Sequence, residues 1–182
     1  MVFETNSEQA TEDFAAALAG KVSPGTVICL DGDLGTGKTV FARGFARGLG
    51  ITEPIVSPTF TILHGYEGGR LPLWHFDVYR IEDPEEMYEI GFEDCFYGDG
   101  VSLVEWASRV KEIIPGDAVH VRIEKNLEKG FDYRRITVSG LREDREKAAD
   151  GEAGPVGWKS ESAVPENSAA PSGPCTEGDK RN

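Results

Sequence analysis

GDLGTGKT occupies residues 32–39 of the chain. It fits the pattern G-x-x-x-x-G-K-[ST], in which backbone N–H groups surround phosphate oxygens, the lysine reaches the β- and γ-phosphates and the hydroxyl ligates Mg²⁺. Lys38 is therefore the predicted phosphate lysine, and Thr39 is the predicted metal ligand. The predicted nucleotide contacts in this loop are Asp33, Leu34, Gly35, Thr36, Gly37, Lys38 and Thr39.

The segments on either side of this loop supply the context that the pattern requires. Residues 27–30 (VICL) are a short apolar run typical of a buried strand, and residues 38–49 are predicted to form a helix that ends at Gly50. A dinucleotide-binding fingerprint, G-x-G-x-x-G, fails here. Counted from Gly35, its last position is Val40 rather than Gly or Ala. A phosphate-binding loop is favoured over that fingerprint and over a Gly-rich turn with an incidental lysine.

The rest of residues 1–140 alternates between helix-like and strand-like segments, which indicates an α/β domain. Thr5 and Glu8 have capping-box spacing at the start of a helix that ends near Gly20. We predict a P-loop NTPase-like three-layer fold with a mostly parallel central sheet and a β-hairpin. The other predicted elements are strands over 60–66 and 71–78 joined by an EGGR turn, a short helix that begins at Pro84 and contains Met87 and Ile90, and strands over 101–104, 119–123 and 135–138.

The composition changes after residue 140. Between residues 141 and 182 the large apolar side chains are Leu141, Val156, Trp158 and Val164. So few apolar groups cannot offset the entropy lost on ordering the segment. The sequence thus predicts a P-loop ATPase domain over residues 1–140 and an acidic, mostly disordered tail over residues 141–182.

Glu105 is the predicted acidic partner of the phosphate loop. A phosphate loop needs a carboxylate at the end of a neighbouring strand to hold Mg²⁺, and Glu105 closes the apolar run over 101–104. The alternative is a surface glutamate that ends a buried strand. Trp106, the next residue, is predicted to pack over the nucleotide or to cover the edge of the sheet.

A second group of candidate residues lies between the loop and Glu105. Asp77, in HFDVYR at 75–80, is predicted to orient the attacking water or to ligate a metal-bound water, unless it forms a structural pair with Arg80. His75 is expected to support this cluster. Thr59, in the SPT triplet at 57–59, contacts the phosphate or Mg²⁺ in one interpretation and belongs to a rigid turn in the other.

Cysteine and histidine usage argues against a disulfide framework and a transition-metal site. The cysteines are three, with no C-x-x-C pair, and the histidines have no close spacing typical of zinc. Cys29, within the apolar run, is expected to be a buried core thiol. The sequence contains no run of 18 apolar residues, and its first residues lack the basic and apolar regions of a signal peptide. We therefore expect a cytoplasmic protein without membrane contact.

Four motifs follow one another in the chain: GDLGTGKT at 32–39, SPTF at 57–60, HFDVYR at 75–80 and LVEW at 103–106. With this order and spacing the chain resembles the bacterial TsaE (YjeE) family over roughly residues 5–140. The resemblance implies a small ATPase that works with the TsaB and TsaD proteins to make threonylcarbamoyladenosine next to the anticodon of certain tRNAs.

The resemblance also implies roles for individual residues. Thr39 and Glu105 match the Mg²⁺ ligands, Lys38 the phosphate lysine and Asp77 an acid important for activity. Thr11 matches a residue near the adenine. ATP and Mg²⁺ are therefore the expected cofactors.

Contact with tRNA is expected only through the partner proteins. The formal net charge is -13, and binding to nucleic-acid phosphates requires clustered Lys and Arg. Direct binding to tRNA should therefore be weak, on the order of 10⁻⁴ M or poorer at physiological salt.

Two other functions remain possible from the sequence. A small-molecule kinase would need an arginine-rich lid, but the candidates Arg43 and Arg47 fall within the helix that follows the loop. A nucleotide-dependent binding module would bind ATP without turnover. No N-K-x-D string, the familiar guanine-reading element, occurs in the chain, which favours ATP over GTP.

Overall fold

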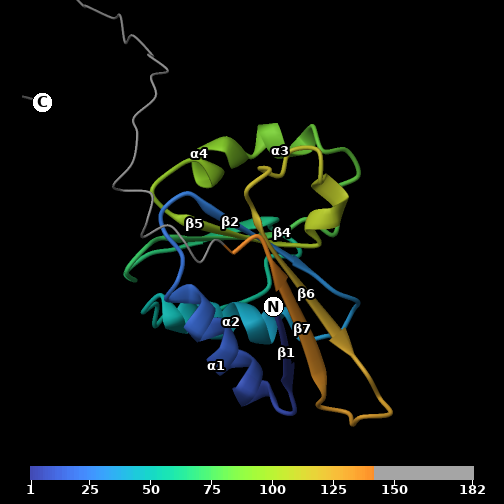
Figure 1. The fold of residues 1–182 in the computed structure, drawn as a ribbon. Coiled ribbons are helices and arrows are strands. Elements are labelled where there is room, and N and C mark those ends of the chain that lie inside the picture. Colours follow the sequence, from blue (N-terminus) through green and yellow to red (C-terminus); the bar gives the residue numbers. More distant parts are fainter. Residues whose placement is uncertain (142–182) are drawn as a thin grey trace, which may run out of the picture. The chain divides into compact units, whose positions relative to one another are not determined.

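The computed structural model describes residues 1–141. These residues form a seven-stranded sheet with the strand order β1-β7-β6-β2-β5-β4-β3 and helices on both sides (Figure 1). The strands are β1 Val2–Thr5, β2 Thr26–Asp31, β3 Leu63–Tyr66, β4 Leu73–Asp77, β5 Val101–Glu105, β6 Val119–Lys125 and β7 Arg134–Ser139. The helices are α1 Glu8–Ala19, α2 Lys38–Gly48, α3 Glu86–Glu89, α4 Phe92–Phe96 and the 3-10 helix η1 Ala107–Val110.

The four central strands, β6, β2, β5 and β4, run parallel. β3 pairs antiparallel with β4 as the predicted hairpin, and β7 and β1 add antiparallel strands at the other side. In this register Glu105 lies beside Leu30 on one side and beside Asp77 on the other. The carboxyl ends of β2, β5 and β4 therefore meet at one edge, where α/β sheets bind their ligands.

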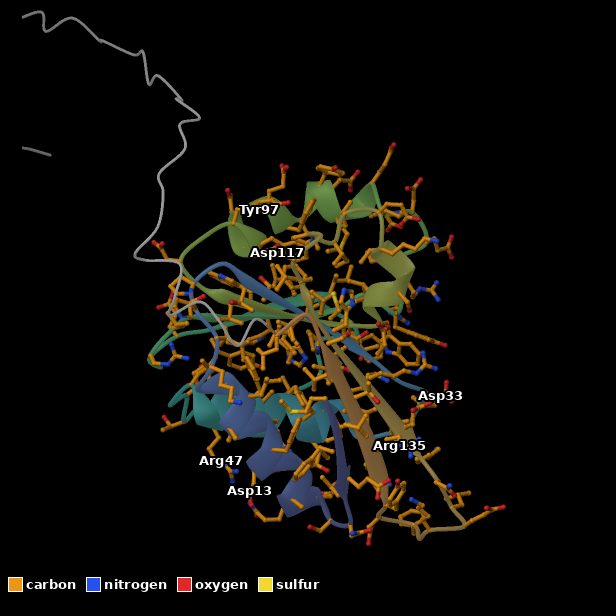
Figure 2. All side chains as sticks on the ribbon, in the orientation of Figure 1. Asp13, Asp33, Arg47, Tyr97, Asp117 and Arg135 are labelled. Carbon is orange, nitrogen blue, oxygen red and sulfur yellow. The ribbon has the colours of Figure 1, made fainter. Side chains whose placement is uncertain are left out.

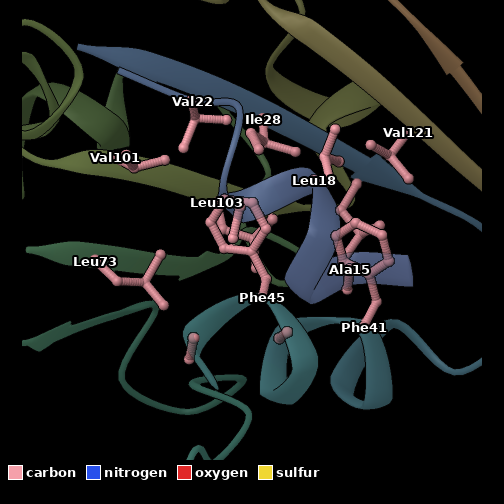
Figure 3. Close-up of a cluster of buried hydrophobic side chains, with 14 of the residues drawn as sticks. Ala15, Leu18, Val22, Ile28, Phe41, Phe45, Leu73, Val101, Leu103 and Val121 are labelled. Carbon is pink, nitrogen blue, oxygen red and sulfur yellow. The ribbon is translucent and has the colours of Figure 1, made fainter. Parts of the chain in front are cut away.

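Two hydrophobic clusters, one on each face of the sheet, give the domain its three layers. α1 and α2 cover one face, and α3, α4 and η1 cover the other (Figure 1). Phe41 and Phe45 of α2 pack towards Ile28 and Leu103 of the sheet (Figure 3). The predicted three-layer α/β fold with a parallel centre is confirmed.

Cys29 belongs to the second of these clusters, as expected of a core thiol. Its side chain is buried, and burial raises the pKa of the thiol to about 12. A thiol with so high a pKa is a poor nucleophile near neutral pH. Within residues 1–141, no helix is long and apolar enough to cross a membrane.

The start of α1 differs from the predicted capping box. Ser7 is the N-cap, and its Oγ accepts a hydrogen bond from the Ala10 N–H at 3.1 Å. Thr5 instead ends β1, a strand that the sequence analysis missed, and its buried hydroxyl lies 2.8 Å from that of Thr11. Ser7 and Thr5 are both good capping residues, and pairing of β1 with β7 decides between them.

Several other predicted elements have different bounds, among them the strand predicted over 71–78, which is observed over Leu73–Asp77. The strand predicted over 60–66 begins at Leu63, because the Pro58 carbonyl accepts hydrogen bonds from the N–H groups of both Thr61 and Ile62 and forms a turn. The helix predicted from Pro84 is observed over Glu86–Glu89 with Ile90 as its C-cap, and α4, which was not predicted, starts after Gly91, whose φ is 69°. Of the tail predicted over 141–182, Leu141 packs against the core, and 142–182 lie outside the described residues.

Gly44 allows α2 to lie against α1. A Cβ atom at this position would lie 2.3 Å from the carbonyl oxygen of Glu12 and 2.4 Å from its Cα. These are backbone atoms, so no side-chain rotation relieves the clash. The close helix pair holds the start of α2, and with it the phosphate loop, against the first hydrophobic cluster.

We expect Gly44→Ala to destabilise the domain by about 1–3 kcal/mol, because overpacking outweighs the roughly 1 kcal/mol by which Ala favours a helix over Gly. Thermal unfolding followed by circular dichroism measures the change. Gly116→Ala is the control, because a Cβ there meets nothing within 4 Å. An unchanged or higher melting temperature for Gly44→Ala would show that the two helices have room to separate.

Candidate nucleotide-binding site

One cavity of about 440 Å³ lies at the carboxyl edge of the sheet, over the start of α2. It brings together four motifs that are far apart in the sequence: the phosphate loop, the SPT segment, the end of β4 and the end of β5. The predicted site residues on its wall are Thr11, Leu34, Gly35, Thr36, Gly37, Lys38, Thr39, Thr59, Asp77, Glu105 and Trp106.

Asp33 is the one predicted site residue that does not line the cavity. Its side chain is exposed and lies at the edge of the domain (Figure 2). Its carbonyl oxygen accepts hydrogen bonds from Lys38 Nζ at 3.2 Å and from Thr36 Oγ1 at 2.9 Å. Asp33 therefore contributes to the loop through its backbone.

The phosphate loop leaves the start of α2 open to an anion. Gly37 is the N-cap with a φ of 99°, a left-handed conformation that favours glycine, and no side chain caps the helix. The first N–H groups of a helix have no partner within the helix, and the helix dipole makes this end partly positive. The loop thus provides the donors and the electrostatic field that a phosphate group requires.

Lys38 is held within the loop and is only 6% exposed. Its Nζ donates to the carbonyl oxygen of Gly32 at 2.7 Å and lies 3.7 Å from the centre of the Trp106 ring. Burial lowers the pKa of Lys38, and the nearby carboxylates of Glu105 and Asp77 oppose that shift. The loop carbonyls and the Trp106 ring therefore fix the position of the amine.

Asp77 is tied to the SPT segment. Its Oδ2 accepts hydrogen bonds from Thr59 Oγ1 at 2.5 Å and from Ser57 Oγ at 3.1 Å, and the two hydroxyls lie 2.8 Å apart. The alternative pair with Arg80 is not formed, since that guanidinium lies 4.6 Å from the centre of the Phe60 ring. The cavity wall thus carries a buried carboxylate beside two hydroxyls.

Glu105 is buried at the end of β5, and its Oε1 lies 2.9 Å from Nε2 of His75. β5 lies between β2, which leads into the phosphate loop, and β4, which ends at Asp77. Two acidic side chains at the ends of adjacent parallel strands therefore face the loop lysine. Glu105, which follows the apolar run over 101–104, is therefore a buried residue of the cavity wall and not a surface glutamate.

Trp106 is half-buried and covers the loop lysine instead of only closing the edge of the sheet. The centre of its ring lies 5.0 Å from the centre of the Tyr79 ring. The Arg109 guanidinium lies 5.6 Å from the centre of the same Tyr79 ring. The φ of Trp106 is 63°, an uncommon value for a bulky residue. The residue after Glu105 is therefore held in a strained turn against the site.

Several residues on the cavity wall were missed in the sequence analysis. Arg134 of β7 donates from Nε to the Thr36 carbonyl at 2.7 Å and from Nη1 to the Phe131 carbonyl at 2.7 Å. Pairing of β7 with β6 brings this segment over the loop, and no motif near Arg134 signals it. The further lining residues are Ser7, Glu8, Val40, Ser57, Tyr79, Phe131, Asp132 and Arg134.

The arginines of α2 belong to the surface between α1 and α2. Arg47 forms an ion pair with Asp13 at 2.6 Å, and both lie on the outer side of the helix pair (Figure 2). Arg43 pairs with Glu8 and Glu12, both at 3.3 Å. Arg43 and Arg47, the two arginines considered for a kinase lid, therefore both form ion pairs with α1.

The donors at the carboxyl edge suit a hard divalent cation. Thr39, Asp77 and Glu105 offer oxygen atoms on the cavity wall, and Mg²⁺ prefers a few protein oxygens together with phosphate oxygens and water. Among residues 1–141, no group of three or more His, Cys, Asp or Glu side chains is arranged to hold a metal ion by itself. The oxygen atoms of Thr39, Asp77 and Glu105 fit a cation whose other ligands would be phosphate oxygens and water.

Comparisons with known proteins identify the family of this chain. The model of the family described as "Threonylcarbamoyl adenosine biosynthesis protein TsaE" matches residues 5–136. A Bacillus subtilis protein named "tRNA threonylcarbamoyladenosine biosynthesis protein TsaE" is 44% identical over 139 residues, which cover 76% of this chain and 85% of the relative. A Treponema pallidum protein of the same name is 42% identical over 119 residues, which cover 65% of this chain and 87% of that relative.

A solved structure has the same fold as this chain. The crystal structure of Bacillus subtilis YdiB superposes with a TM-score of 0.68 at 37% sequence identity and covers 82% of this chain and 91% of that chain. The family match spans the phosphate loop, the SPT segment and the ends of β4 and β5. The chain belongs to the TsaE family.

Proposed function

We propose that this protein is a Mg²⁺-dependent ATPase that acts in the biosynthesis of threonylcarbamoyladenosine in tRNA. The observation that carries the proposal is the meeting of the Lys38 loop with Asp77 and Glu105 around one cavity. A loop lysine with an open helix start binds phosphate. Two carboxylates at the facing strand ends supply the groups that hydrolysis needs.

The phosphates bind along the loop in this proposal. The N–H groups at the start of α2 and the Lys38 ammonium receive the β- and γ-phosphate oxygens. Both are fixed beforehand by the carbonyls of Gly32 and Asp33 and by Arg134 on Thr36. Donors that need no rearrangement stabilise the charge of the transition state most effectively.

Thr39 and Glu105 would hold Mg²⁺ on the same wall of the cavity. When bound, the ion neutralises the charge of the phosphates. The protein contributes by fixing these two oxygen ligands, one at the start of α2 and one at the end of β5.

Asp77 is proposed to orient the attacking water. Its Oδ2 already accepts hydrogen bonds from Ser57 and Thr59, so its direction is fixed, and its carboxylate lines the cavity. A positioned carboxylate can accept the proton of a water that attacks phosphorus. Thr59 acts in this scheme through Asp77 or through the phosphate itself.

Phe131 is proposed to contact the adenine. It is 81% exposed, yet it lines the cavity with Thr11 and Arg134, on the strand β7 and helix α1 side of the loop. An exposed aromatic ring at the mouth of a nucleotide cavity is a suitable surface for a base.

The substrate pathway is taken from the relatives. The Bacillus and Treponema proteins carry tRNA threonylcarbamoyladenosine biosynthesis in their names. We propose that this chain, acting in the cytoplasm, hydrolyses ATP to reset a complex of the TsaB and TsaD proteins. With a net charge of -13 it meets tRNA only through that complex.

Lys38→Ala and Glu105→Ala should separate binding from turnover. We expect Lys38→Ala to weaken ATP binding at least tenfold, because the variant loses a positioned charge, and Glu105→Ala chiefly to remove metal-dependent turnover. Isothermal titration measures binding, and phosphate release in the presence of the TsaB and TsaD proteins measures turnover. Unchanged phosphate release in Glu105→Ala would contradict its role.

Asp77→Ala should lower turnover by about 10²–10⁴-fold, the usual contribution of a positioned acid or base, while ATP affinity changes little. Asp33→Ala is the matched control, because its carboxylate is exposed outside the cavity. Equal losses of affinity and turnover in Asp77→Ala would instead assign Asp77 a structural role in holding the SPT segment.

Phe131→Ala should weaken ATP binding by about 5- to 150-fold, on the basis of roughly 1–3 kcal/mol for a base stacked on an aromatic ring. Leu127→Ala is the control, since Leu127 is 69% exposed on the same connection and lies outside the cavity. Neither variant should alter the melting temperature. Equal ATP affinity for the two variants would remove Phe131 from the base-binding surface.

A further inference from the structure

We infer that His75 is a positioning residue that fixes the Glu105 carboxylate for the cation of the proposed site. The inference rests on the proposed function and concerns a side chain that does not itself line the cavity. His75 lies in β4, two residues before Asp77, and pairs in register with Leu103 of β5. Glu105 lies two residues further along β5, so both side chains project from the same side of adjacent strands.

The hydrogen bond between these side chains is fully enclosed. The side chain of His75 is 0% exposed and that of Glu105 is 3% exposed, and their Nε2 and Oε1 atoms lie 2.9 Å apart. A carboxylate oxygen accepts hydrogen bonds, so the N–H of Nε2 is the donor of the hydrogen bond to Glu105.

The other ring nitrogen, Nδ1, indicates that packing alone does not account for a histidine at position 75. Nδ1 is buried and has no hydrogen-bond partner within residues 1–141. A buried polar atom without a partner destabilises the folded state, and an apolar side chain of similar size would avoid that cost. The bond from Nε2 to Glu105 is what a histidine offers here that phenylalanine or leucine does not.

This hydrogen bond holds the Glu105 side chain in one orientation. A glutamate has three side-chain torsions, and the carboxylate of Asp77 lies on the adjacent strand end and repels it. Holding Oε1 against His75 fixes the carboxylate and leaves Oε2 for the cavity, whose wall Glu105 forms. Outer partners that orient a metal-binding carboxylate typically contribute about 10- to 100-fold to metal affinity.

Three variants of the full chain test the inference. His75→Phe removes the donor and the orphaned Nδ1, His75→Gln keeps an N–H near the position of Nε2, and His64→Gln is the matched control. His64 pairs in register with His75 from β3, its ring lies 4.4 Å from that of Tyr66, and it does not line the cavity. His75→Leu serves as the second apolar variant if His75→Phe fails to fold.

Binding of Mn²⁺ by electron paramagnetic resonance, in the presence of a non-hydrolysable ATP analogue, is the readout. We expect Mn²⁺ affinity to fall about 10- to 100-fold in His75→Phe, to recover to within about threefold of the wild-type value in His75→Gln, and to stay unchanged in His64→Gln. Affinity for the analogue in EDTA should be the same in all variants. The melting temperature of His75→Phe should not fall.

Two results would overturn the inference alone. One is wild-type Mn²⁺ affinity in a folded apolar variant, and the other is an equal loss in His75→Gln and His75→Phe, which would assign His75 a packing role. Failure of the wild-type chain to bind the analogue, with or without Mn²⁺, would instead overturn the proposed function.

Discussion

Parallel pairing of β4, β5 and β2 is the constraint on which the site depends. Three strands that run in one direction deliver their carboxyl ends to one edge of the sheet. The chain leaves β2 through the phosphate loop, β5 through Glu105 and β4 through Asp77. A slip of one residue in either pairing would turn an acidic side chain away from Lys38, so the buried apolar strands that fix the register also fix the chemistry.

Backbone strain is concentrated around the same edge. Among residues 1–141, Ile62 and Trp106 are the two non-glycine residues with positive φ, at 65° and 63°. Ile62 closes the turn that carries Ser57 and Thr59 to Asp77, and Trp106 follows Glu105 directly. Strained residues persist only where the surrounding structure holds them, and they are common at functional sites. Packing elsewhere in the domain therefore maintains the geometry of the site.

Local patterns in the sequence predicted much of this arrangement. The Gly-rich loop between an apolar run and a helix, and the apolar run ending in Glu105, are continuous in the chain and can be recognised without a structure. Their meeting at one edge follows from the parallel strands that such runs form. The hairpin and the three layers followed from the same patterns.

Features that depend on distant pairing were not predictable in this way. Arg134 reaches the loop because β7 pairs with β6, and Thr5 ends a strand because β1 pairs with β7. A capping box and a strand end look alike when only spacing is known. The hydrogen bond from His75 to Glu105 likewise depends on the register of β4 on β5, which could not be predicted from the sequence.

The fate of the γ-phosphate tests the central claim most directly. Purified protein is incubated with γ-labelled ATP and Mg²⁺, alone and with the TsaB and TsaD proteins. The account predicts labelled inorganic phosphate, formed faster with the partner proteins and abolished by EDTA. Label transferred to a small molecule without free phosphate would contradict it in favour of a kinase, and phosphate release at background in both conditions would leave a nucleotide-binding module.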